Sequence, residues 1–154
     1  MQLARLITEI ALFVRAQKMQ LRFGELSRSP LLMLRFELRG NVAECDWMAR
    51  SADQWDAGLR RDVSDLNVSK QALKDVIAVR QLLFSALPAV ESASLRFFRE
   101  SAQGERQLLI AGTVSRQQGS VAHISSLAMK AKLLGLRFWL QDGILEPMPV
   151  ENAP

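Results

Sequence analysis

The sequence predicts a single α+β domain of antiparallel β-hairpins, about six or seven strands in all, packed against two to three helices. Some segments alternate apolar and polar side chains, as strands do, whereas others repeat them at helical spacing. The chain has 154 residues, 49% hydrophobic and 23% charged, which suits one hydrophobic core. The expected order is α-β-β-β-α-β-β-α-β-β over residues 1–150, with a flexible tail at 151–154.

Residues 2–17 have the pattern of an amphipathic helix. Its apolar positions are Leu3, Leu6, Ile7, Ile10, Phe13 and Val14. This stripe needs a surface to pack on, which is the body of the domain, a partner subunit or a membrane face. The run contains Arg5 and Glu9 and is too short to span a bilayer, so we expect neither a signal peptide nor a transmembrane anchor.

From Met19 the apolar period changes to two residues, which indicates half-buried strands. We expect a short strand over 19–24 and a longer one over 32–39. Gly40 and Asn41 then supply a two-residue turn, because both tolerate positive φ angles, and residues 42–50 return as the partner strand.

The register of this hairpin follows if its apolar side chains share one face and Arg39 faces Val42. The pairs are then Leu38–Ala43, Phe36–Cys45 and Leu34–Trp47 on the apolar face, with Glu37–Glu44 and Arg35–Asp46 on the charged face.

Residues 51–68 show no period, so we expect a loop there, with a short helical turn near Trp55. Ser69 is the expected N-cap of a long helix that stops at Pro88. The wide apolar face of this helix is typical of packing against a sheet.

The last third of the chain predicts a hairpin, a helix and another hairpin. The first hairpin runs over 93–101 and 106–115, with Leu108, Ile110 and Val114 on one face. The helix covers 120–134 and ends at Gly135. The last hairpin runs over 136–148 around the turn Asp142–Gly143.

Side chains that carry chemistry are sparse. His123 is the only histidine, and Cys45 is the only cysteine. We expect His123 at the surface of the helix over 120–134, and Cys45 in the core with a raised pKa and little reactivity. We therefore predict no cofactor, no metal site and no enzymatic activity. An enzyme would require folding to bring a carboxylate to His123.

Two acidic patterns invite other interpretations. Asp65, Asn67 and Ser69 alternate as in a calcium loop, but Lys70 and Val76 stand where that loop needs Gly and Glu. The opposed acids of the first hairpin lie among Arg side chains, which is typical of a surface ion network.

Alternation gathers guanidinium groups and aromatic rings on the outward face of the strands. The residues are Arg35, Arg39, Arg96, Phe98, Arg137 and Trp139. Such a face can bind single-stranded nucleic acid by base stacking and phosphate neutralisation. Alternatively, a helix or a second copy covers the rings, with Arg stems packed along them. Acidic side chains on the same face disfavour phosphate.

We therefore predict a non-catalytic protein-interaction or structural module that self-associates, most simply as a homodimer, through sheet edges or exposed aromatic and apolar positions. Single-stranded nucleic-acid (RNA) binding is the alternative. The net charge of +4 permits an acidic partner without forming a basic tail. The single cysteine favours a reducing, cytoplasmic location, and we expect no membrane partner.

Overall fold

The computed structural model describes residues 31–51, 60–117 and 121–149. The elements in this part of the chain are β1 (Leu32–Arg39), β2 (Val42–Met48), α2 (Arg61–Ala86), β3 (Ser92–Glu100), β4 (Arg106–Ser115), α3 (Leu127–Leu133), β5 (Leu136–Arg137), β6 (Trp139–Gln141) and β7 (Ile144–Glu146). The α+β prediction is confirmed. The predicted helix over 2–17, the strand over 19–24, the turn near Trp55 and the tail over 151–154 lie outside the described residues.

The strands form a five-stranded sheet in the order β1-β2-β3-β4-β5, and β6 and β7 form a separate two-stranded sheet. Both long hairpins, β1–β2 and β3–β4, are antiparallel as predicted. The sequence made no prediction of how the two hairpins pair with each other, and they are joined by the parallel pairing of β2 with β3. Helix α2 has 26 residues, about 39 Å at 1.5 Å per residue, and this length carries the chain back so that β3 starts beside the start of β2.

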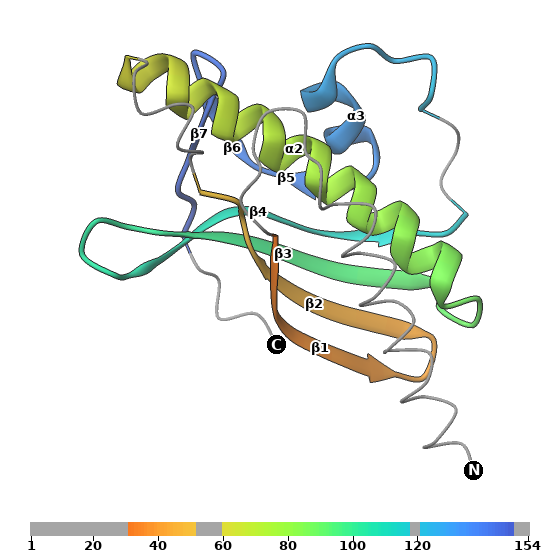
Figure 1. The fold of residues 1–154 in the computed structure, drawn as a ribbon. Helices are drawn as coiled ribbons and strands as arrows, with labels where there is room; N and C mark the ends of the chain where they lie inside the picture. The colour runs from red at the N-terminus through yellow and green to blue at the C-terminus, as the bar shows by residue number, and fades with distance from the viewer. Residues whose placement is uncertain (1–30, 52–59, 118–120, 150–154) are drawn as a thin grey trace.

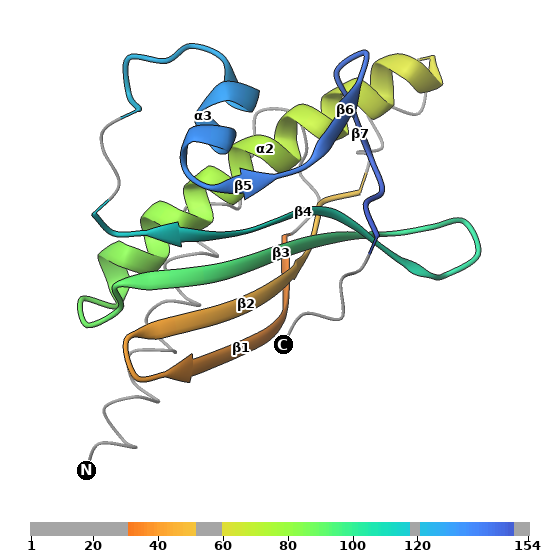
Figure 2. The same ribbon diagram turned by 180° about the vertical axis from the view of Figure 1, so that it is seen from behind.

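Both helices lie on one face of the five-stranded sheet (Figures 1 and 2). The main core lies between the helices and the sheet. Its fully buried side chains include Trp47, Phe97, Val76 and Leu83. The rings of Trp47 and Phe97 stack with their centroids 6.2 Å apart. No helix in the described part of the chain covers the opposite face, which we call the open face.

Helix α2 begins at Arg61, so the predictions of a loop up to residue 68 and of a cap at Ser69 are wrong. The helix begins with the exposed polar residues Arg61 and Asp62. An apolar repeat therefore does not mark its start in the sequence. Ser69 is instead buried inside the helix, where its Oγ accepts a hydrogen bond from Leu145 N at 2.9 Å. The predicted end before Pro88 is confirmed.

Helix α3 is shorter than the predicted 120–134, since it starts at Leu127. The Ser126 side chain accepts a hydrogen bond from Met129 N at 3.2 Å and so acts as the N-cap. Serine competes well for cap positions, which explains why the helix begins there. His123 lies in the turn before the helix, and it is exposed at the surface as expected.

The predicted register of β1–β2 is confirmed from Arg39–Val42 to Arg35–Asp46. The prediction that Leu34 faces Trp47 is wrong, because a bulge makes Met33 face Trp47. Leu34 therefore packs on the open face and not in the main core.

A second bulge lies in β3–β4, where the register shifts between Phe97 and Phe98. Phe98 pairs with Leu108, whereas Phe97 pairs with Ile110. The prediction of one shared face for Leu108, Ile110 and Val114 is therefore wrong, because Leu108 packs on the open face and the other two pack in the main core.

The predicted hairpin over 136–148 is divided in two. Strand β5 joins the large sheet beside β4, and β6 and β7 pair only with each other. The division occurs at Phe138, the one residue that separates β5 from β6 in the sequence. Its side chain is buried in the main core. The turn at Asp142–Gly143 is confirmed, with φ angles of 52° and 81°, as a type I′ turn requires.

Candidate functional site

A charged row crosses the open face from one edge of the sheet to the other. Arg35, Asp46, Arg96, Ala111 and Arg137 are successive cross-strand partners from β1 to β5. Cross-strand partners project to the same face. The fold therefore brings together three of the predicted site residues, Arg35, Arg96 and Arg137, in a single row.

Asp46 is the centre of this row. Its carboxylate accepts hydrogen bonds from Arg96 Nε at 2.8 Å and Nη2 at 2.6 Å, and from Arg35 Nε at 3.2 Å. Burial alone would raise the pKa of Asp46, but the hydrogen bonds from Arg96 and Arg35 outweigh it and the pKa is lowered. The carboxylate is therefore charged at neutral pH, and it neutralises cations that a phosphate would otherwise meet.

Arg39 extends the same ion network to the end of β1, because Glu37 Oε2 also lies 3.1 Å from Arg35 Nη1. Arg39 Nη2 lies 2.9 Å from Glu37 Oε2, and its Nε lies 3.5 Å from Glu44 Oε2. The hydrogen bond from Arg39 is the main reason why the pKa of Glu37 is lowered. The opposed acids Glu37 and Glu44 are thus both held beside guanidinium groups, as the sequence pattern indicated.

Phe98 faces away from the helices as predicted, but its ring is covered. Only 5% of it is exposed, and it packs with Leu108 and Ala111. The Arg96 guanidinium lies 5.2 Å from the Phe98 ring centroid. The two bulges supply this cover, because they turn Leu34 and Leu108 to the open face. Phe98 therefore belongs to a small second core and is not a free stacking platform.

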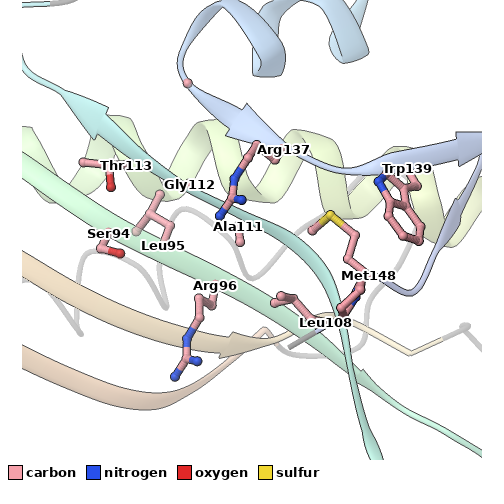
Figure 3. Close-up of a pocket in the computed structure, with 12 residues that line it drawn as sticks. Ser94, Leu95, Arg96, Leu108, Ala111, Gly112, Thr113, Arg137, Trp139 and Met148 are labelled. Atoms are coloured by element: carbon pink, nitrogen blue, oxygen red, sulfur yellow. The ribbon is translucent and has the colours of Figure 1, made fainter. Parts of the chain in front are cut away.

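A groove of about 730 Å³ lies on the open face over β3, β4 and β5 (Figure 3). Ala111 and Gly112 line it on β4, and Arg137, Trp139 and Met148 line it beyond that strand. Trp139 is 54% exposed, and this makes it the exposed ring of the predicted face. Large, partly exposed Trp and Met side chains beside Arg are typical of protein-binding surfaces.

Close backbone packing holds Trp139 in this position. A Cβ added to Gly112 would overlap Gly135 O and would lie 2.9 Å from Leu136 Cα, so only glycine lets β5 pair so tightly with β4. On the far side of the β6–β7 turn, the Leu145 N–H donates to Ser69 on α2. Trp139 therefore projects from a small hairpin that is held at both ends.

No pattern in the sequence marks Met148 as a groove residue. It forms an isolated bridge to Leu108, and its N–H donates to Leu108 O at 2.8 Å. This pairing follows from the bulge in β3–β4 and from the division of the last hairpin. The alternation of side chains predicts neither the bulge nor the division. The residues that line the groove could therefore not be predicted from the sequence.

Cys45 and His123 lie apart from this face. Cys45 is buried opposite Phe36, and burial raises the pKa of its thiol to about 12. The thiol is therefore protonated at neutral pH and a poor nucleophile. In residues 31–51, 60–117 and 121–149, no three His, Cys, Asp or Glu side chains are grouped so that they could hold a metal ion.

Comparisons of this chain with protein-family models, with curated proteins and with solved structures find no match. Within the described residues, no helix combines the length and apolarity that crossing a bilayer requires.

Proposed function

We propose that the chain is a non-catalytic protein-interaction module that binds a polypeptide partner in the groove of the open face and also self-associates. The observation that carries this proposal is the half-exposed Trp139 beside the groove of about 730 Å³. Trp and Arg are the side chains most often found as hot spots of protein interfaces. The partner that suits this surface is a segment with a large apolar side chain, which would pack against Trp139 and Met148.

The charge of the open face supports a protein partner over nucleic acid. Arg35 and Arg96 are hydrogen-bonded to Asp46, and Arg39 is paired with Glu37 and Glu44. Proteins that bind single strands neutralise phosphates with cations and stack bases on several exposed rings. Here the acidic side chains would repel phosphate, and the Phe98 ring is covered.

The state of Cys45 supports a role without catalysis, because a buried thiol whose pKa is about 12 is a weak nucleophile. His123 is exposed in a surface turn. Water there would solvate a reacting group and weaken its interaction with the imidazole. We also propose a reducing, cytoplasmic location, which this single buried thiol suits.

The test uses peptides selected from a phage-displayed random library against the purified chain, with affinities measured by calorimetry. Trp139→Ala should weaken binding about tenfold or more, as expected for a hot spot. Leu140→Ala is the matched control, because Leu140 is the next residue of β6 and is 37% exposed. Equal affinities for both variants would contradict the groove as the binding site.

Poly(U) RNA is the second probe in the same experiment. We expect weak retention at low salt that does not depend on Trp139. Tight binding that falls steeply with salt, and that Arg137→Ala and Trp139→Ala both weaken, would instead support the nucleic-acid function.

A further inference from the structure

Two arginines lie beside one aromatic ring near the end of α2, away from the groove. Arg80 belongs to α2, and Arg116 directly follows β4, whose end lies beside the last turns of that helix (Figure 1). The Cζ atoms of Arg80 and Arg116 lie 5.2 Å and 4.9 Å from the centroid of the Phe84 ring. Each cation is attracted to the ring, so the two charges are held close to each other.

Backbone carbonyl groups fix the positions of both side chains. Arg80 Nη2 donates to Ser115 O at 2.7 Å. Arg116 donates from Nε to Val90 O and from Nη2 to Leu87 O, each at 2.8 Å. These bonds need N–H donors but not a positive charge, because a carbonyl oxygen is neutral. The two guanidinium groups are therefore pre-organised while their charges stay unneutralised.

No acid of the described residues neutralises this pair. None of their carboxylates forms an ion pair with Arg80 or Arg116. Glu91 is close in sequence to the carbonyl groups that bind Arg116, but it is exposed and pairs with neither arginine. The half-buried Arg96, by contrast, lies 2.6 Å from a carboxylate oxygen of Asp46.

Like charges held together in a partly buried place are unfavourable. Burial, and then the charge of Arg116, lower the pKa of Arg80, which still carries its charge at neutral pH. Arg80 Nε is buried and has no hydrogen-bond partner among the described residues. The negative end of the α2 dipole offsets only about half an elementary charge. Most of the positive charge therefore remains for an anion to neutralise.

We propose that Arg80 and Arg116 together bind an oxyanion, which is the phosphate or the carboxylate group of a ligand. Guanidinium groups suit both, because their N–H donors match a pair of oxygens. Both side chains are half-buried, so an anion reaches their Nη groups from solvent. The site is separate from the groove, because α2 lies on one face of the sheet and the groove lies on the other.

Titration of the full, isotope-labelled chain, followed by NMR of the arginine Nε–H groups, tests the proposal. Nε of Arg80 is buried and Nε of Arg116 is hydrogen-bonded, so both N–H groups are protected from exchange with water. Inorganic phosphate and acetate are added separately at constant pH and ionic strength. Both resonances should shift together and reach saturation at millimolar concentration. Saturation at a lower concentration of phosphate assigns the site to a phosphate group, and the reverse order assigns it to a carboxylate.

Arg80→Gln tests the pair with little effect on the fold, because Arg80 bonds only one carbonyl group. In this variant the Arg116 Nε–H group should report binding weakened about tenfold or more, since a charge-assisted hydrogen bond is lost. Arg99→Gln is the matched control. Arg99 is also half-buried and donates to the neutral Gln107 Oε1, and its replacement removes the same charge. Its affinity for phosphate should equal that of the wild type.

Resonances of Arg80 and Arg116 that do not move, or that move without saturating, would overturn the proposal. Equal losses of affinity in Arg80→Gln and Arg99→Gln would also overturn it, because net charge alone would then explain the binding. Arg80→Gln should bind the selected peptides as the wild type does. Failure of the anion site and failure of the groove are therefore independent results.

Discussion

Asp46 sets the charge balance of the open face. It is 5% exposed and accepts hydrogen bonds from guanidinium groups on both neighbouring strands. The sequence predicted the Arg35–Asp46 pair, because the register of one hairpin fixes it. It could not predict the bond from Arg96, because that bond depends on the parallel pairing of β2 with β3, and alternation does not encode which strands become neighbours.

We expect Asp46→Asn to lower the free energy of unfolding by about 1–3 kcal/mol at neutral pH, because the amide loses charge-assisted bonds and points N–H groups at guanidinium donors. Urea unfolding measures this loss. Glu44→Gln is the control, and its half-exposed pair with Arg39 should contribute no more than about 0.5 kcal/mol. A loss at Asp46 no greater than at Glu44 would contradict this role.

The same variant gives a pH prediction. Because folding lowers the pKa of Asp46, the unfolded chain binds more protons at acid pH, and the stability from this carboxylate is lost as pH falls below about 4. The difference in stability between wild type and Asp46→Asn should therefore be full at neutral pH and shrink in acid. A difference that stays constant from neutral pH to about pH 3 would show that charge is not its origin.

At the scale of the elements, alternation predicted the two long hairpins and their turns well. It failed at the bulges, because one extra residue exchanges the faces of all side chains beyond it. Leu34 and Leu108 moved to the open face in this way. The start of α2 was missed for a related reason, since its first turns are solvated and show no period.

Gly112 is the residue on which the position of β5 depends. We expect Gly112→Ala to destabilise the fold by about 1–3 kcal/mol, as overpacking does, or to displace β5 and with it Trp139. Urea unfolding and the affinity for the selected peptides measure the two effects. Thr113→Ala is the comparison for stability, since Thr113 is the next residue of β4 and is exposed. Gly112→Ala with wild-type stability and affinity would rule out this packing constraint.

In the molecule as a whole, charged side chains join α2 and the turn after it to the two opposite ends of the sheet. Arg50, just after β2, has its Nε 2.8 Å from Asp75 Oδ2 in the core, and both side chains are almost fully buried. Near the other end, Arg116 donates to Leu87 O and Val90 O, each at 2.8 Å. These contacts hold α2 on one face and so leave the other face open for the groove.

We expect Asp75→Asn to cost about 3–5 kcal/mol, because the buried Arg50 guanidinium loses the carboxylate with which it forms an ion pair. The double variant Arg50→Met with Asp75→Leu should recover most of that loss, because two apolar side chains place no charge in the core. Chemical denaturation of the three chains measures both. Asp62→Asn is the exposed control, and a loss at Asp75 as small as at Asp62 would contradict the role of this pair.

We propose that the open face, and not the helical face, binds the polypeptide partner. Hydrogen exchange of the chain with and without a selected peptide, followed by mass spectrometry, distinguishes the two faces. We predict slower exchange at residues 108–113 and 136–141, with no change in α2. Slower exchange in α2 and α3, with residues 108–113 unaffected, would contradict the account.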